Sequence, residues 1–136
     1  MRVNFEELEP RLVEEFLLDT YEGKPFTGIA YETWANGGLR SEAEFVDGLK
    51  SGLSKDWFQN GQIKSEMNLR QGDGHGLSQT WYENGQLKSQ TICEYGIKLS
   101  EKVWDNAGLL TRNFQLKEDD FYYSILKRRR EESATF

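Results

Sequence analysis

The chain of 136 residues contains a single cysteine, a single histidine and only two prolines. One cysteine cannot form an internal disulfide, whereas small secreted domains usually contain several cysteines. The first ten residues, MRVNFEELEP, lack the apolar segment of a signal peptide. No run approaches the roughly 18 to 20 apolar residues that a membrane helix needs. We therefore expect a cytoplasmic protein.

Clusters of basic residues are also scarce. The net charge is -6, and residues 1–23 supply most of it, with seven acidic and two basic residues. Residues 24–116 hold eleven acidic and ten basic residues, and residues 117–136 hold five of each. Nucleic-acid binding depends on clustered Lys and Arg, so this composition argues against a nucleic-acid partner. It is compatible with a basic protein partner.

Groups that could carry out catalysis or bind a metal are few. A Cys–His pair would need His75 and Cys93 within about 3 Å of each other. His75 lies in a glycine-rich turn, and Cys93 fills a repeat position that Phe45 and Leu69 fill elsewhere, so we expect Cys93 to be a buried apolar residue. Two such residues cannot form a zinc site either. The sequence therefore predicts no enzyme, no metal and no cofactor.

From Gly28 onward the sequence repeats every 24 residues. The matching positions include Gly28, Gly52 and Gly76; Trp34, Phe58 and Tyr82; Asn36, Asn60 and Asn84; Gly37, Gly61 and Gly85; Leu39, Ile63 and Leu87; and Gly48, Gly72 and Gly96. A fourth copy is shifted by one residue, so that Trp104 corresponds to Trp81 and Gly108 corresponds to Gly85. A single repeat cannot bury its apolar row alone, and stacked neighbours form a continuous core.

Each repeat predicts a β-hairpin. The pairs Asn60-Gly61 and Asn84-Gly85 stand between alternating runs and predict type I′ turns, which need positive φ at both central residues. Short links force neighbouring strands to be antiparallel. The predicted fold is mainly β, an antiparallel β-hairpin repeat meander in an elongated twisted single sheet, with a C-terminal α-helix.

The two ends of the chain depart from this period. Residues 1–23 form an acidic segment in which we predict a short helix or turn near residues 4–9, capped by Asn4 and Glu7, and a strand around residues 13–21. Residues 24–116 hold the repeats. In residues 117–136 the period becomes helical from Asp119, which predicts a helix through Arg130, docked on the last hairpin as a cover for the open sheet edge. The tail of residues 131–136 is expected to fray.

The phrases WFQNGQIKSEMNL and TWYENGQLKSQ, together with the glycines that close each unit, resemble the MORN-variant repeat, a bacterial form built around W-Y-x-N-G-Q-L-K-S. The opening GKPFTGIAYETWANGGLRSE resembles the first repeat of small proteins in that group. Many such proteins are antitoxins or immunity proteins of bacterial toxin systems. The resemblance implies a non-catalytic protein that neutralises a cognate toxin by stoichiometric binding. The alternative is a structural or scaffolding module that binds other proteins or a membrane surface, although the net negative charge counts against a membrane.

Two groups of residues are candidates for partner binding. The first is acidic and would steer a basic toxin such as a nuclease: Glu14, Glu15, Asp19 and Glu22. The second is an aromatic ladder: Trp34, Phe58 and Tyr82. Cross-strand aromatic residues stabilise sheets, but those on an open face form binding hot spots, so both readings of the ladder stay open. The open edges of the sheet also leave a homodimer open.

Overall fold

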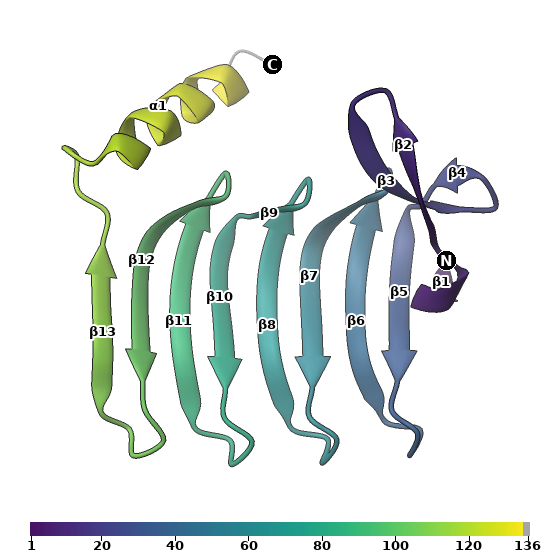
Figure 1. The fold of residues 1–136 in the computed structure, drawn as a ribbon, viewed down its shortest axis with the longest axis horizontal. Helices are drawn as coiled ribbons and strands as arrows, with labels where there is room; N and C mark the ends of the chain where they lie inside the picture. The colour runs from purple at the N-terminus through teal and green to yellow at the C-terminus, as the bar shows by residue number, and fades with distance from the viewer. Residues whose placement is uncertain (135–136) are drawn as a thin grey trace.

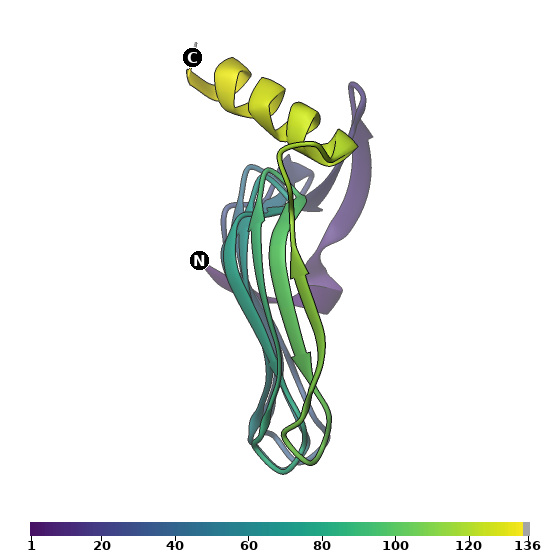
Figure 2. The same cartoon turned by 90° about the vertical axis from the view of Figure 1, so that its left-hand side faces the viewer.

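The computed structural model describes residues 1–134 as an elongated, curved sheet with one helix at its end (Figures 1 and 2). The elements are β1 (Arg2–Asn4), the 3-10 helix η1 (Phe5–Glu7), β2 (Glu9–Val13), β3 (Phe16–Tyr21), β4 (Lys24–Pro25), β5 (Gly28–Thr33), β6 (Leu39–Val46), β7 (Leu49–Trp57), β8 (Ile63–Arg70), β9 (Asp73–Gly74), β10 (Gly76–Trp81), β11 (Leu87–Glu94), β12 (Ile97–Trp104), β13 (Leu110–Gln115) and α1 (Phe121–Ala134). The predicted fold class is confirmed.

The main sheet has the strand order β1-β5-β6-β7-β8-β10-β11-β12-β13, with β9 paired to β8. All its neighbouring strands are antiparallel except β1, which lies parallel to β5 with Val3 opposite Ala30. A separate three-stranded sheet has the order β2-β3-β4. The meander was predicted, whereas the parallel edge strand and the second sheet were not.

The repeat hairpins close at the lower end of the sheet in Figure 1. In each of them one N–H donates to the carbonyl four residues further on, which leaves a three-residue loop between the two residues. In the β7–β8 hairpin, the Phe58 N–H donates to the Gln62 carbonyl at 2.8 Å, and the Gly61 N–H donates to the Phe58 carbonyl at 3.0 Å. Gly61 has φ of +89°, while Asn60 is not among the residues with positive φ. The prediction of a type I′ turn at Asn-Gly is therefore wrong. The loop is a type I turn followed by a left-handed glycine.

The repeated asparagine joins one loop to the next. Asn60 Oδ1 accepts the Gln62 N–H at 3.0 Å, and Asn60 Nδ2 donates to the Glu83 carbonyl in the following hairpin at 3.4 Å. Asn36 makes the same two kinds of bond at 2.9 and 3.1 Å. Aspartate could accept in its own turn but has no amide to donate to the neighbouring turn. Asn84 Oδ1 likewise accepts the Gln86 N–H at 3.0 Å, but its amide faces Gln86 Oε1 at 3.5 Å within its own loop. The dual role therefore explains the asparagine at the first two copies, Asn36 and Asn60.

The type I′ turns lie at the upper end of the sheet instead. Asp47, Gln71 and Tyr95 have φ of +50°, +50° and +51°, and each is followed by a glycine with positive φ. An L-residue in the left-handed region costs roughly 1–2 kcal/mol. These turns are thus held in place by contacts with their neighbours.

A second repeated position supplies such a contact. The N–H of Gln71 donates to Ser51 Oγ at 3.0 Å, and the N–H of Tyr95 donates to His75 Nδ1 at 3.0 Å. In the first unit Thr27 Oγ1 accepts the corresponding N–H at 2.9 Å. The histidine therefore has a structural role as the acceptor between stacked turns.

The buried core lies at the N-terminal end of the sheet. Its members are at most 5% exposed: Val3, Phe26, Ala30, Ala43 and Phe45. The Phe26 and Phe45 rings meet edge to face with centroids 5.6 Å apart, and Phe5, Leu8 and Tyr21 pack against the cluster. Phe5, Leu8, Tyr21 and Phe26 thus cover one face of β5 and β6, while most of the rest of the main sheet is a single layer.

Helix α1 lies across the upper end of the sheet (Figure 1). Leu126 is fully buried, and the Arg130 guanidinium binds the Glu94 carboxylate with two hydrogen bonds of 2.7 and 2.8 Å. Arg129 Nη1 donates to the Tyr95 carbonyl. The helix therefore docks on the β11–β12 turn and leaves β13 largely exposed, in contrast to the predicted cover for that edge. Residues 131–134, expected to fray, continue the helix, and residues 135–136 lie outside the described part.

The N-terminal segment is more structured than predicted. The expected turn near residues 4–9 corresponds to η1, in which Asn4 Oδ1 accepts the Glu6 N–H and Glu7 Oε2 accepts the Asn4 N–H, both at 2.9 Å. The expected strand around residues 13–21 corresponds to β3, which begins at Phe16, but the preceding strand β2 that pairs with it in a hairpin was not predicted. Pro10 lies in β2, an edge strand, where a missing N–H is tolerated.

Candidate partner-binding surface

The β2–β3 hairpin projects from the body of the protein. Its strands pair from Glu9 opposite Thr20 to Val13 opposite Phe16, and Glu14 and Glu15 form the turn. In Figure 1 it rises beyond the upper ends of the neighbouring strands, and in Figure 2 it stands to one side of the sheet. We call residues 12–17 the hairpin tip.

The hairpin tip exposes four large apolar side chains. Leu12 is 73% exposed, Val13 40%, Phe16 60% and Leu17 66%. Successive side chains of a strand point to opposite faces, so the Leu12–Leu17 pair and the Val13–Phe16 pair lie on opposite faces of the hairpin. Single exposed apolar residues are ordinary, but four large ones gathered at one hairpin tip, two on each face, indicate an interaction site.

The base of the same hairpin is anchored. The Asp19 N–H donates to the Gly48 carbonyl, and the Phe26 N–H donates to the Asp19 carbonyl, both at 2.9 Å. Thr20 is 1% exposed, and its hydroxyl donates to the Glu9 carbonyl at 2.7 Å. The tip is therefore presented from a fixed base.

The four acidic candidates are divided between the tip and the base. Glu14, with φ of +57°, and Glu15 are exposed at the turn beside the apolar side chains. Glu22 lies in the β3–β4 turn, and Asp19 is half-buried at the base. The structure thus brings Glu14 and Glu15 to the apolar patch but leaves Asp19 and Glu22 away from it.

The aromatic ladder lies at the opposite ends of the strands, beside the lower loops, because its residues directly follow β5, β7 and β10. Trp34, Phe58 and Tyr82 are all half-buried. A cationic side chain six residues further along lies over each ring, at 4.7 Å for the first, 5.8 Å for the second and 5.5 Å for the third. The ladder and the acidic candidates therefore do not form one site.

Polar atoms of the ladder link neighbouring hairpins. Trp34 Nε1 donates to the Trp57 carbonyl at 3.3 Å, and the Tyr82 hydroxyl donates to the Trp104 carbonyl at 2.8 Å. Each acceptor belongs to the next repeat along the chain. These bonds favour the structural reading of the ladder.

The sheet face that carries the core continues as an open polar surface. Asp56 Oδ1 accepts the Ser41 hydroxyl at 2.5 Å, and Asp56 Oδ2 accepts the Ser65 hydroxyl at 2.8 Å. A cleft of about 560 Å³ lies between this row and η1, with Phe5 and Met67 in its walls. Because both carboxylate oxygens of Asp56 already accept hydroxyl groups, the row satisfies itself.

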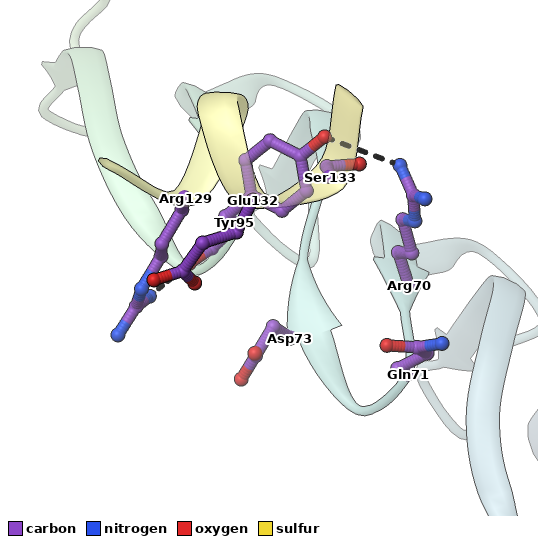
Figure 3. Close-up of a pocket in the computed structure, with 7 residues that line it drawn as sticks. All are labelled: Arg70, Gln71, Asp73, Tyr95, Arg129, Glu132 and Ser133. Atoms are coloured by element: carbon purple, nitrogen blue, oxygen red, sulfur yellow. Dashed lines mark hydrogen bonds between the residues drawn. The ribbon is translucent and has the colours of Figure 1, made fainter. Parts of the chain in front are cut away.

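A second cleft, of about 580 Å³, lies beneath the last turns of α1 (Figure 3). Arg129 and Glu132 come from the helix, Tyr95 from the β11–β12 turn, and Arg70 and Asp73 from β8 and β9. The Tyr95 hydroxyl faces Arg70 Nη1 at 3.5 Å, and the Arg70 guanidinium lies 5.4 Å from the Tyr95 ring centroid. The cleft is thus lined by both acidic and basic side chains at the place where α1 docks on the sheet.

Shifted pKa values occur at the C-terminal hairpins. The hydrogen bond from Arg130 lowers the pKa of Glu94, and the hydrogen bond from Lys98 lowers the pKa of Glu101. Cys93, which we expected to be buried, is only half-buried, and this partial burial raises the pKa of its thiol. The two lowered carboxyl pKa values therefore occur where Glu94 binds helix α1 and where Glu101 binds Lys98 of the same strand.

Among residues 1–134, no group of three or more His, Cys, Asp or Glu side chains is arranged to hold a metal ion. Within the same residues, no helix is both long enough and apolar enough to cross a bilayer.

Reasoning from the sequence missed the apolar residues of the hairpin tip. A signal was present in the run LVEEFLL, where the only polar residues are two glutamates and the apolar residues do not alternate with polar ones. We interpreted this run as one strand, and one strand would bury much of it. A hairpin with its turn at Glu14 and Glu15 exposes it instead.

Comparison with known proteins agrees with the repeat architecture. The family model of the MORN repeat variant matches residues 50–71 and 74–92, which run from β7 into β11. The fold and these matches define a β-hairpin repeat protein of the MORN-variant class. No solved structure matches the chain.

The chain is also 52% identical over 132 residues to the immunity protein YwqK of Bacillus subtilis (strain 168), which covers 95% of this chain and 86% of that protein. The chain therefore belongs to the family of that immunity protein. The predicted resemblance to MORN-variant immunity proteins is confirmed.

Proposed function

We propose that this protein neutralises a cognate toxin by binding it stoichiometrically in the cytoplasm, without a catalytic step of its own. The observation that carries the proposal is the exposed apolar hairpin tip, in a chain from an immunity-protein family. Burial of one large apolar side chain contributes about 1.5–3 kcal/mol. Four such side chains on a fixed base supply a substantial part of the free energy that association requires.

The charge of the N-terminal segment supports a basic toxin. The three-stranded sheet, residues 9–25, holds five acidic and two basic residues. Opposite charges across an interface speed association and disfavour wrong partners. Binding at the hairpin tip would block the toxin's active site or its substrate groove.

The test is co-expression with a toxin-like protein encoded beside this gene. The wild-type protein should restore growth and form a 1:1 complex in native mass spectrometry. The variant Leu17→Asp should lose rescue, because it puts a carboxylate in the apolar patch. The control Leu110→Asp changes a residue on β13 that is 49% exposed and should rescue as the wild type does. Growth arrest that persists with folded wild-type protein, and no complex, would remove the proposal.

A further inference from the structure

We infer that the hairpin tip enters a cleft of the toxin and is contacted on both of its faces, with Lys or Arg side chains at the floor of that cleft. This inference rests on the proposed function and specifies how its surface is used.

Apolar residues lie on both faces of the hairpin tip. Leu12 and Leu17, 73% and 66% exposed, lie on one face, while Val13 and Phe16, 40% and 60% exposed, lie on the other. A partner with a flat surface would cover one pair and leave the other in water. Only an occupant that surrounds the tip covers both pairs.

The size of the hairpin tip sets the size of the cleft that can surround it. Two paired strands with side chains on both faces are about 10 Å thick, and three residues of a strand extend about 10 Å. The complementary cleft therefore has apolar walls about 10 Å apart and a similar depth. Because the base of the hairpin is fixed to the turn at Gly48, the tip keeps this shape before binding.

The end of the hairpin tip is negatively charged. Within residues 1–134, the carboxylates of Glu14 and Glu15 have no ion-pair or hydrogen-bond partner, and both lie at the end that reaches the floor of the cleft. A carboxylate removed from water without a partner is strongly unfavourable. The floor must therefore supply cationic groups, as a site for an anionic substrate does.

Other occupants fit less well. Strand addition to the edge of β2 would meet Pro10, which has no N–H for a ladder bond. Two copies that met tip to tip would bring their glutamates together without a counter-charge. An anionic membrane surface would repel the same carboxylates.

The experiment uses isothermal titration calorimetry to measure binding to an inactivated form of the toxin-like protein that was used in the co-expression test. One variant, Leu12→Ser with Leu17→Ser, alters the first face, and another, Val13→Ser with Phe16→Ser, alters the second. Each should weaken binding at least 100-fold. The matched control, Leu109→Ser with Leu110→Ser, alters side chains that are 66% and 49% exposed elsewhere and should change affinity less than threefold.

A third variant, Glu14→Gln with Glu15→Gln, tests whether the floor of the cleft carries cationic side chains. It should weaken binding about tenfold at low salt and reduce the salt dependence of the association rate. Circular dichroism and thermal unfolding of each free variant establish that the fold is retained.

The outcomes separate the two proposals. If the wild type binds and only one face variant weakens binding, docking is flat and the cleft is refuted. If the wild type binds and neither face variant matters, the toxin binds elsewhere and only this inference falls. A tip-dependent dimer of the free protein in sedimentation would also overturn it. If the wild type does not bind the toxin, the proposed function falls first.

Discussion

The repeat hairpins and the N-terminal hairpin have the same secondary structure but differ in what their side chains contact. In the repeats, recurring side chains are engaged within the sheet: Asn60 joins two loops, and Ser51 holds a left-handed turn. In the hairpin tip, Leu12, Phe16 and Leu17 are left to solvent. The comparison teaches that the repeated positions specify the sheet, whereas a segment outside the repeat supplies the surface that a partner can recognise.

The largest expected effect separates two phenylalanines, one in each region. Phe45 is 2% exposed and Phe16 is 60% exposed. Phe45→Ala should lower the free energy of unfolding by about 3–5 kcal/mol, because it leaves a cavity in the core. Phe16→Ala should change it by about 0.5 kcal/mol or less. Urea denaturation measures both, and equal losses would show that the tip is part of the core.

The next comparison concerns two glycines with similar backbone angles. Gly48 has φ of +85° and Gly61 has φ of +89°. A Cβ at Gly61 would meet nothing within 4 Å, whereas a Cβ at Gly48 would lie 2.8 Å from Leu18 Cβ in the N-terminal hairpin. Gly61→Ala should cost about 1–2 kcal/mol for its left-handed backbone. Gly48→Ala should cost at least about 1 kcal/mol more for overpacking.

Thermal unfolding of the two glycine variants gives the difference directly. Identical losses would mean that the hairpin base does not rest on the Asp47-Gly48 turn.

A smaller effect is expected where one turn holds the next. Ser51→Ala removes the acceptor of the Gln71 N–H and should cost about 1 kcal/mol. Ser51→Thr keeps the hydroxyl, as Thr27 does at the matching position, and should stay close to the wild type. Denaturant unfolding of both variants is the measurement. A loss from Ser51→Thr as large as that from Ser51→Ala would refute the hydroxyl's role.

The smallest effect is the pH dependence of α1 docking. Arg130 lowers the folded-state pKa of Glu94, so the contact stabilises docking fully above the ordinary carboxyl pKa. This stabilisation is lost as the pH falls through the lowered pKa of the folded state. Amide hydrogen exchange of α1, corrected for intrinsic rates, should rise in acid relative to that of β7 and β8. Glu94→Gln should show the faster exchange at neutral pH and lose this acid response.

The sequence was sufficient to predict the repeat sheet because its signals are local and recur. Local signals alone led to the wrong position for the type I′ turns. The pair Asn84-Gly85 is typical of such a turn, but only Gly85 has a positive φ there. The true type I′ turns carry Asp, Gln or Tyr before glycine, and their φ values depend on acceptors 20 residues earlier.

Three further features depend on contacts between distant segments. Strand β1 has only three residues and exists because it pairs with β5. The turn at Glu14 and Glu15 contains no glycine or asparagine, so the sequence gives no local signal for a turn there. Helix α1 was predicted from its period, but its position depends on Arg130 meeting Glu94, 36 residues away. The acidic candidates were chosen by charge alone, which could not show that only Glu14 and Glu15 reach the apolar tip.

The most direct test of the account is hydrogen exchange of the protein alone and bound to its inactive toxin, resolved by peptide. The account predicts that new protection is concentrated in residues 12–17 and that β8, β10 and β11 exchange as in the free protein. Protection that spreads over those repeat strands, with the hairpin tip unchanged, would contradict it.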